Sequence, residues 1–183
     1  MTDAVAAPIA RITFRALALD DLPMLQAWVR RPHVAEWWDD DTSLEALREY
    51  YGPSIAGEEP GRQFIAMLDG EPIGFIQHYR AVDCHADGWW LAENDPGVFG
   101  IDQFLAESGR LGQGLGTAMI SAFVRTILCG PGVTRIQVDP DPRNARAIRC
   151  YAKVGFREQA VVRTPDGDAQ MMYLDPQRAQ PST

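Results

Sequence analysis

The segment Leu111-Gly112-Gln113-Gly114-Leu115-Gly116-Thr117 is a glycine-rich connection between a predicted strand and a predicted helix. Glycines let the backbone approach an anion closely, and the free N–H groups at the start of the following helix point toward that anion. The spacing therefore predicts a pyrophosphate site. It is not the ATP-binding pattern, because no Gly-Lys-Ser/Thr follows, and its position mid-chain does not suit a dinucleotide-binding βαβ unit. The alternative is a plain strand-to-helix connection.

Two aspartates follow apolar residues close to this segment. Asp102 lies within the apolar run Gly100 to Leu105, and Asp139 directly follows the apolar run Val133 to Val138. A charge inside such a run is costly unless it is paired or hydrogen-bonded, and a carboxylate there can accept a proton from a reacting group or bind a cation. The alternatives are a surface or sheet-edge carboxylate at Asp102, and a turn with a helix start in Asp139-Pro140-Asp141-Pro142.

The elements that must position these residues follow from the apolar periodicity. It predicts strands at 12–19, 62–68, 73–79, 97–105, 133–138, 156–163 and 169–174. It predicts helices over 22–29 after Asp20 or Asp21, over 43–51 after Thr42 or Ser43, over 119–128, and from Pro142 to Val154 before Gly155. Asp69-Gly70 and Asp166-Gly167 predict hairpin turns. The pattern indicates an α/β fold of the α+β kind, with a mixed sheet that carries helices on its faces.

Length and composition narrow the possible functions. A chain of 183 residues predicts one compact domain, 1–183, with a loose tail at 176–183. A net charge of −8 disfavours nucleic acid and anionic membranes and favours a cationic small molecule. The three cysteines have no disulfide or zinc spacing, and His33, His78 and His85 form no metal or nucleophile pattern, so no metal is expected. The absence of an export signal or membrane segment predicts a cytoplasmic protein.

A second motif, Asn144-Ala145-Arg146-Ala147-Ile148-Arg149-Cys150-Tyr151-Ala152-Lys153-Val154-Gly155-Phe156, follows the glycine-rich segment. Together, in order and spacing, the two resemble the acetyl-CoA core of the GNAT (GCN5-related N-acetyltransferase) superfamily. The resemblance implies the GNAT acyl-CoA N-acyltransferase fold, with a largely antiparallel mixed sheet and acetyl-CoA as co-substrate. The acetyl-CoA core would span 98–160, and the acceptor-binding elements would lie mainly in 30–100.

The resemblance extends over almost the whole chain to aminoglycoside 6'-N-acetyltransferases of the AAC(6')-Ib type. It is carried by these strings: Val34-Ala35-Glu36-Trp37-Trp38, Ile65 to Gly74, Asp87-Gly88-Trp89-Trp90, Asp95 to Val98, Gly100 to Leu105 and Thr164 to Gly167. It implies transfer of acetyl from acetyl-CoA to the 6'-amine of an aminoglycoside antibiotic, which confers resistance. Two features depart from the pattern: Leu111 stands where most superfamily members carry Arg or Gln, and the segment Arg80 to His85 differs from the family's loop.

Carried over residue by residue, the resemblance implies a role for each motif position. Asp102 would be the base that receives the amine proton, and Tyr151 would stabilise or protonate the departing thiolate; the alternative for Tyr151 is a core aromatic. Asn144 would meet the pantetheine or CoA side. The pyrophosphate would be held by the backbone of Gln113, Gly114, Gly116 and Thr117. The acceptor would be bound by Trp37, Trp38, Tyr51, Glu59, Asp87, Trp89, Trp90, Asp139 and Asp166. Without the resemblance, such carboxylates are more often surface charges and such tryptophans core residues.

Two other functions stay open at this stage. The same scaffold could acetylate another amine, such as a siderophore precursor, a polyamine or a protein amine. A non-catalytic module that binds CoA as a sensor or sequesters the drug is the second, although intact Asp102 and Tyr151 argue against it. The resemblance is compatible with a monomer or a homodimer.

Overall fold

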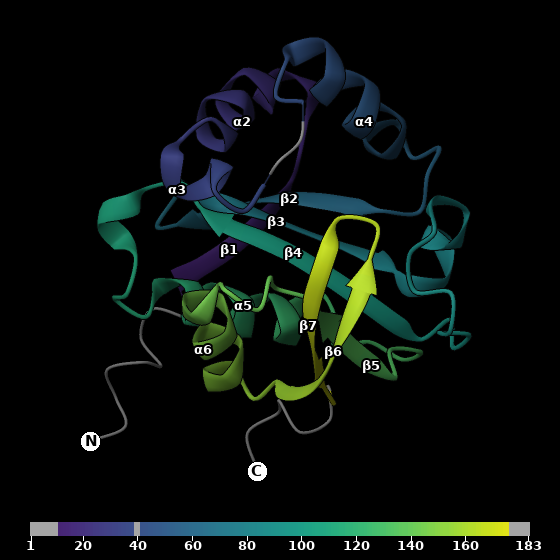
Figure 1. Cartoon of the computed structure of the whole chain (residues 1–183). Coiled ribbons are helices and arrows are strands. Elements are labelled where there is room, and N and C mark those ends of the chain that lie inside the picture. The colour runs from purple at the N-terminus through teal and green to yellow at the C-terminus, as the bar shows by residue number, and fades with distance from the viewer. Residues whose placement is uncertain (1–10, 39–40, 176–183) are drawn as a thin grey trace.

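The computed structural model of the chain describes residues 11–38 and 41–175. Its centre is a seven-stranded sheet in the order β1-β2-β3-β4-β5-β7-β6 (Figure 1). All neighbouring strands are antiparallel except β4 and β5, which are parallel. The strands are β1 (Ile12–Ala16), β2 (Arg62–Leu68), β3 (Glu71–Arg80), β4 (Val98–Leu105), β5 (Arg135–Val138), β6 (Arg157–Thr164) and β7 (Gly167–Leu174). The expected mixed sheet is confirmed, while the expected loose tail 176–183 lies outside the described residues.

Helices cover both faces of this sheet. The helices are α2 (Leu22–Val29), α3 (Pro32–Ala35), α4 (Leu44–Ala56), α5 (Leu115–Thr126) and α6 (Ala145–Val154). Short 3-10 helices are η1 (Leu19–Asp21), η2 (Ala81–Asp87) and η3 (Ser108–Arg110). Figure 1 shows α2, α3 and α4 on one side of the sheet and α5 and α6 on the other. Within the described part of the chain, no helix is both long and apolar enough to cross a membrane.

Each helical layer has its own apolar core. Phe75 and Phe104 join the buried residues of α2 and α4 on one face. On the other face, Ile101 and Ile136 pack with Phe123 of α5 and Tyr151 of α6. Side chains alternate between the faces of a strand, so Ile101 and Phe104, three positions apart on β4, belong to opposite cores. The next residue after Ile101, Asp102, therefore points toward the α2–α4 face.

Polar caps and glycines set several helix ends as expected. Ser43 Oγ accepts a hydrogen bond from Ala46 N at 3.1 Å at the start of α4. Gly155 ends α6 with φ at 115°, a left-handed conformation that favours glycine. Gly155 was predicted in this role from the sequence, and Ser43 was one of the two predicted caps, the other being Thr42.

Three predicted element ends are wrong for local reasons. Asp21 does not cap α2 with its side chain, because the carboxylate accepts a hydrogen bond from Ala18 N and pairs with Arg15 at 2.6 Å. The first strand accordingly stops at Ala16, before η1. Pro142 precedes α6, which begins at Ala145, because the Asn144 side chain accepts a hydrogen bond from Ala147 N and forms the cap.

Helix α4 runs past the predicted end at Tyr51, through Pro53 to Ala56. Gly52-Pro53 is typical of a helix end, but the last turn is held by tertiary contacts. Ser54 is buried, and its hydroxyl donates to Gln63 Oε1 on β2 at 2.8 Å. Burial of this turn against the sheet therefore outweighs the helix-breaking tendency of the dipeptide.

Candidate active site

Strands β4 and β5 pair over only three residues. Val98, Phe99 and Gly100 lie opposite Arg135, Ile136 and Gln137, and β4 then continues to Leu105 while β5 ends at Val138. Beyond Gly100, the side of β4 that faced β5 has no strand partner among the described residues. Unpaired N–H and C=O groups of a strand can bind an extended ligand that carries amide groups. The strand divergence can therefore bind an extended ligand that contains amide groups, such as the pantetheine part of CoA.

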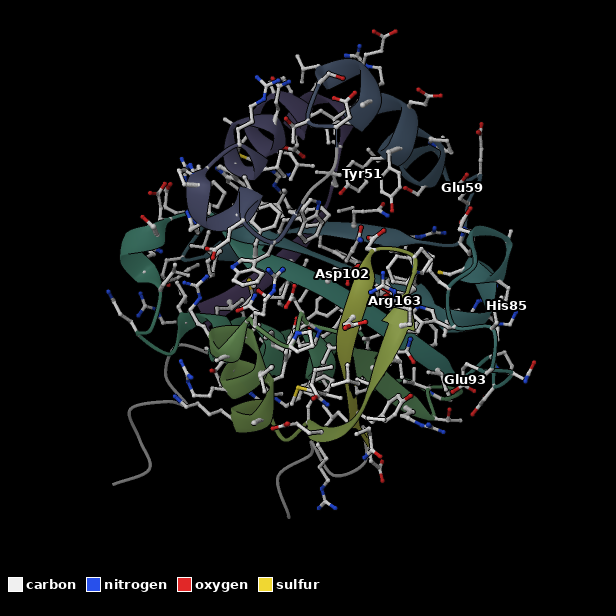
Figure 2. All side chains as sticks on the ribbon, viewed as in Figure 1. Tyr51, Glu59, His85, Glu93, Asp102 and Arg163 are labelled. Carbon is white, nitrogen blue, oxygen red and sulfur yellow. The ribbon has the colours of Figure 1, made fainter. Side chains whose placement is uncertain are left out.

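Asp102 lies on β4 just past this divergence. On the neighbouring strand β3 its partner is Gln77, and Gln77 Nε2 donates to Asp102 Oδ2 at 2.8 Å. The same face carries the pair Phe75–Phe104 on one side and the pair Tyr79–Gly100 on the other. Figure 2 shows Asp102 between α4 and the β6–β7 hairpin. Gln77 thus holds the carboxylate on the face of the sheet that α2 and α4 cover.

Asp139 occupies the matching position after β5. Continuing the register of the paired residues would set Asp139 opposite Asp102, although the strands no longer pair there. Burial raises the pKa of Asp139 well above the usual range, and the charges of Asp102 and Asp166 raise it further. A half-buried carboxylate beside like charges is a strong site for a cation, because a bound ammonium group relieves both effects.

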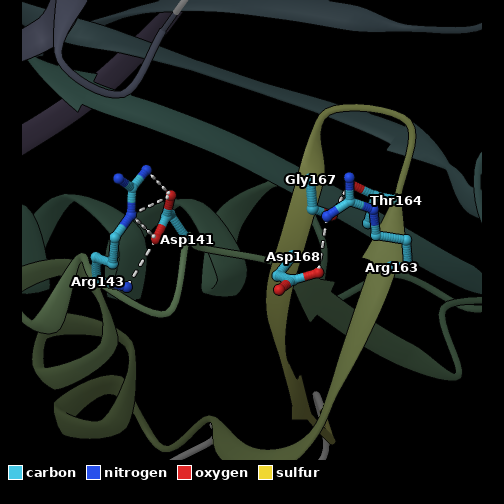
Figure 3. Close-up of polar contacts among 6 residues, drawn as sticks. All are labelled: Asp141, Arg143, Arg163, Thr164, Gly167 and Asp168. Atoms are coloured by element: carbon cyan, nitrogen blue, oxygen red, sulfur yellow. Dashed lines mark hydrogen bonds and ion pairs between the residues drawn. The ribbon is translucent and has the colours of Figure 1, made fainter.

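The charge at Asp141, two residues on, is neutralised instead. The guanidinium of Arg143 donates to both Asp141 oxygens, and this hydrogen bonding lowers the pKa of Asp141 (Figure 3). The two aspartates of Asp139-Pro140-Asp141-Pro142 therefore differ in role. Asp141 belongs to the turn, whereas Asp139 belongs to the carboxylate group around Asp102.

The β6–β7 hairpin brings Asp166 toward the same region. Thr164 Oγ1 donates to Gly167 O at 2.9 Å and Arg163 pairs with Asp168, so the turn is closed around Asp166 (Figure 3). A Cβ on Gly88, next to Asp87, would lie 3.7 Å from Pro165 Cγ in this turn. The segments that carry Asp87 and Asp166 are thus close in space although far apart in sequence, and the charge of Asp166 acts on Asp139.

Sequence reasoning missed Tyr79, which lies directly beside the carboxylates. Its ring covers Gly100, where a Cβ would be only 2.3 Å from the ring carbon Cζ. The Trp90 side chain is hydrogen-bonded to the phenol. Burial raises the pKa of Tyr79 well above its usual value, helped by the charges of Asp102 and Asp139. A glycine inside the apolar β4 run was the available signal, because it marks close approach of another group to the backbone.

Tyr151 approaches from the other face of the sheet. It is buried on α6, packs edge-on against Phe156 and is hydrogen-bonded to Gln103 of β4. Burial raises the pKa of Tyr151 far above its usual value, and the charge of Asp102 adds to the effect. Tyr151 is therefore a protonated phenol throughout the physiological range. Gln103, its partner, was another residue without a predicted role.

The glycine-rich segment has the geometry expected of an anion site. Gly112 and Gly114 have φ of 72° and 83°, and Gly114 is the N-cap of α5 without a side-chain cap. The first N–H groups of α5 are therefore free of a capping side chain and can bind phosphate oxygens. Gln113 Nε2 donates to Gly109 O, and Thr117 Oγ1 contacts Cys150 Sγ at 3.4 Å. Because both side chains are bonded within the protein, a ligand would be bound by the backbone groups of these residues.

Asn144 is the cap of α6, with Oδ1 accepting a hydrogen bond from Ala147 N at 3.0 Å. This side-chain oxygen is thus engaged within the protein. The predicted contact between Asn144 and the CoA side stays a prediction. Such a contact would be made by the side-chain amide nitrogen or by the backbone of Asn144.

The remaining predicted acceptor residues fall into two groups. Trp89 and Trp90 are half-buried, and their rings are 5.3 Å apart. They follow Asp87 in the chain, and the Trp90 side chain reaches the phenol of Tyr79. Trp38 and Tyr51 instead pack against Phe75 in the α2–α4 core, and Glu59 is exposed beyond α4 (Figure 2). Trp37 is half-buried, and its Nε1 is buried without a hydrogen-bond partner in the described structure. The structure thus gathers Trp90, Asp102, Asp139 and Asp166, and Asp87 lies next to Gly88, which is near the turn that carries Asp166.

Three comparisons identify relatives of this chain. Residues 18–164 match the family model described as an acetyltransferase (GNAT) domain. Over 164 residues the chain is 48% identical to aminoglycoside N(6')-acetyltransferase type 1 of Klebsiella pneumoniae, which covers 88% of this chain and 81% of the relative. A kanamycin resistance protein of Rhizobium radiobacter is 56% identical over 84 residues, 46% of this chain and 78% of the relative.

Solved structures agree with these relatives. Aminoglycoside acetyltransferase AAC(6')-Ib in complex with coenzyme A has a TM-score of 0.85 and 48% identity, over 91% of this chain and 95% of that one. The same enzyme with coenzyme A and kanamycin has a TM-score of 0.84 over the same shares of the two chains. The chain therefore belongs to the GNAT acetyltransferase superfamily, in the group of the aminoglycoside 6'-N-acetyltransferases.

Proposed function

We propose that this chain transfers acetyl from acetyl-CoA directly to the 6'-amine of an aminoglycoside, and that it does so in the cytoplasm as one catalytic domain. The observation that carries the proposal is the group of Asp102, Asp139 and Asp166 at the divergence of β4 and β5. Burial and mutual repulsion raise the pKa of Asp139, so this group is poised for a ligand with several positive charges. An aminoglycoside has this chemistry.

The residues around the strand divergence fit acetyl-CoA. The uncapped start of α5 after Gly112 and Gly114 suits the pyrophosphate, and the unpaired side of β4 suits the pantetheine amides. When bound, acetyl-CoA supplies the acetyl group as a thioester. Asp102 and Tyr151 approach the strand divergence from opposite faces of the sheet. Asp102 can therefore act at the attacking amine while Tyr151 acts at the leaving sulfur.

Asp102 is the proposed proton acceptor at the reacting amine. An alkylamine with a pKa near ~10 must lose a proton before it can attack, which costs roughly 3 to 4 kcal/mol at neutral pH. The hydrogen bond from Gln77 fixes the Asp102 carboxylate, which can receive the proton directly or through water. Gln77 is thus a positioning residue for Asp102.

Asp139 and Asp166 bind charge instead. Carboxylates that hold the substrate also raise its amine pKa and oppose deprotonation. This conflict is resolved if Asp139 and Asp166 pair with the distant ammonium groups while Asp102 alone faces the reacting amine. Trp90 and Trp89 add flat apolar surfaces against which sugar rings can pack.

Tyr151 acts at the sulfur of the leaving group. Its raised pKa keeps the phenol protonated, but it also makes the phenol a much weaker acid than an ordinary thiol. Complete transfer of the phenol proton to sulfur would therefore be uphill. We infer that Tyr151 stabilises the thiolate mainly by donating a hydrogen bond, and Gln103 orients the phenol for this.

The decisive test is release of free thiol from acetyl-CoA with kanamycin as acceptor, followed by mapping of the acetylated amine. We expect acetylation at the 6' position and a loss of about 100-fold or more in kcat for Asp102→Asn. The matched control is Asp69→Asn, which makes the same charge change in the β2–β3 turn, where Asn also tolerates the positive φ of 52°.

Other outcomes point to other functions. Turnover of a polyamine or a siderophore precursor without turnover of any aminoglycoside would assign a different amine acceptor. Binding of kanamycin and acetyl-CoA without thiol release would indicate a sequestering module. Equal loss of activity in Asp102→Asn and Asp69→Asn would remove Asp102 from the role of base.

A further inference from the structure

Trp90 has an unusual backbone conformation for a bulky residue. Its φ is 53°, and among the described residues other than glycine only Asp69 shares a positive φ. Asp69 lies in a hairpin turn, where this conformation is ordinary, whereas a large side chain at positive φ is strained. Trp90 is therefore held in place by its surroundings and would relax if they were removed.

The carbonyl oxygen of Trp90 accepts two hydrogen bonds. Glu93 N donates at 2.7 Å, which closes a local turn that begins at Trp90. His85 Nε2 lies 3.1 Å from the same oxygen, and it must be the donor because a carbonyl only accepts. His85 belongs to η2, so this bond ties Trp90 to the preceding element.

Helix η2 is itself anchored to the sheet. Arg80, the last residue of β3, pairs with Asp83 at 2.8 Å, and Cys84 Sγ donates to Arg80 O. The backbone N–H groups of Gly88 and Trp89 donate to His85 O and Cys84 O and close the end of η2. His85 is therefore a fixed point against which the Trp90 carbonyl is set.

The position of Trp90 in turn affects the carboxylates. Its side chain is hydrogen-bonded to the Tyr79 phenol, and Tyr79 covers Gly100 beside Asp102 and Asp139. His85 lies on the outer side of this loop, away from Asp102 (Figure 2). Its effect on the acceptor must therefore pass through Trp90.

We propose that His85 is a positioning residue that holds Trp90 in its strained conformation and thereby sets the affinity for the aminoglycoside. The inference rests on the proposed function, because Trp90 is there an acceptor-binding residue. Loss of His85 should weaken acceptor binding without affecting the acetyl-CoA side.

The test compares His85→Leu, His85→Gln and His85→Asn. Gln carries its amide nitrogen about as far out as histidine carries Nε2, whereas Asn reaches only as far as Nδ1. We expect His85→Leu and His85→Asn to raise the KM for kanamycin about three- to tenfold, the range for one neutral hydrogen bond, with kcat and the KM for acetyl-CoA little changed. His85→Gln should restore most of the affinity.

A second readout does not depend on activity. The protein labelled with 5-fluorotryptophan has five tryptophans, and Trp90→Phe assigns the fluorine resonance of Trp90. This resonance should shift in His85→Leu and return in His85→Gln. His33→Leu is the control, because His33 Nε2 makes a comparable bond to a carbonyl, Leu105 O at 3.0 Å, elsewhere in the fold.

The kanamycin kinetics and the fluorine resonance together distinguish failure of the role of His85 from failure of the proposed function. An unmoved Trp90 resonance in His85→Leu, or a kanamycin KM that rises equally in the Gln and Leu variants, would overturn the role of His85. A wild-type protein that does not acetylate kanamycin would refute the proposed function instead, and the fluorine resonance would still decide whether His85 holds Trp90.

Discussion

Asp102 on β4 and Asp139, just past the end of β5, lie at matching positions, each two residues beyond the last strand pair, Gly100 with Gln137. At this point the strands separate, and the charge of Asp102 raises the pKa of Asp139. In the free protein, burial and this repulsion favour the protonated carboxyl of Asp139, and a bound polycation would favour its ionised form. Substrate recognition is therefore coupled to the stability of the fold.

Replacing Asp139 with Asn should stabilise the free protein at alkaline pH. The pKa of Asp139 is raised in the folded state, so the folded state keeps a proton that the unfolded state has lost. Stability is then lost as pH rises from the unfolded pKa of about 4 through the higher folded value. We expect Asp139→Asn to gain about 1 kcal/mol at pH 8, or about 3 °C in Tm, and nothing at pH 4.

Asp141→Asn is the matched control for this experiment. The pKa of Asp141 is lowered by hydrogen bonding to Arg143, so its ionised form stabilises the fold above the unfolded pKa. Its replacement should leave Tm unchanged or slightly lower at pH 8. Thermal melts of both variants at pH 4 and pH 8 give the comparison, and a lower Tm for Asp139→Asn at pH 8 would contradict the proposed strain.

Tyr151→Phe should lower kcat while leaving acceptor binding intact. The change removes the donor at the leaving sulfur and the hydrogen bond with Gln103, but it preserves the buried ring against Phe156. We expect kcat to fall about 100-fold. Tyr173→Phe is the control, since Tyr173 of β7 lies under the guanidinium of Arg135 of β5. Similar rates for the two variants would remove Tyr151 from the chemistry.

His78 should make the fold acid-sensitive. It is partly buried beside Phe64, Phe99 and Phe123, and burial, together with the charge of Arg62, lowers the pKa of His78 to about 4. The unfolded state therefore binds a proton first, and stability falls as pH drops from about 6.5 toward 4. His78→Phe should remove about 1 to 2 kcal/mol of this loss, measured by urea unfolding at pH 7 and pH 5. An equal loss in both proteins would exclude His78.

The sequence predicted the sheet strands and the two motifs well, because each is set by local residues. Short apolar runs define β2 and β7, and Gly155 marks the helix end that it was expected to mark. The end of α4 could not be predicted, because it depends on the contact between Ser54 and Gln63 across the fold.

The sequence predicted which residues form the site better than it predicted the hydrogen bonds between them. Asp102 and Tyr151 stood out because a charge in a strand and a family motif are visible in the sequence. Their partners Gln77 and Gln103 did not, because the register between β3 and β4, and the packing of α6 on the sheet, are set by long-range contacts.

Gly100→Ala should disable the site by displacing Tyr79. A Cβ at this position would lie 2.3 Å from Cζ of the Tyr79 ring, and the ring cannot yield without leaving Trp90 and the carboxylates. We expect a loss of about 1 to 3 kcal/mol in the free energy of unfolding from overpacking, and a larger KM for kanamycin. Gly52→Ala is the matched control in α4, where nothing lies within 4 Å of the added Cβ. It should stabilise the protein by about 0.5 to 1 kcal/mol, because alanine favours a helix. Full activity in Gly100→Ala would show that Tyr79 does not need its place over Gly100.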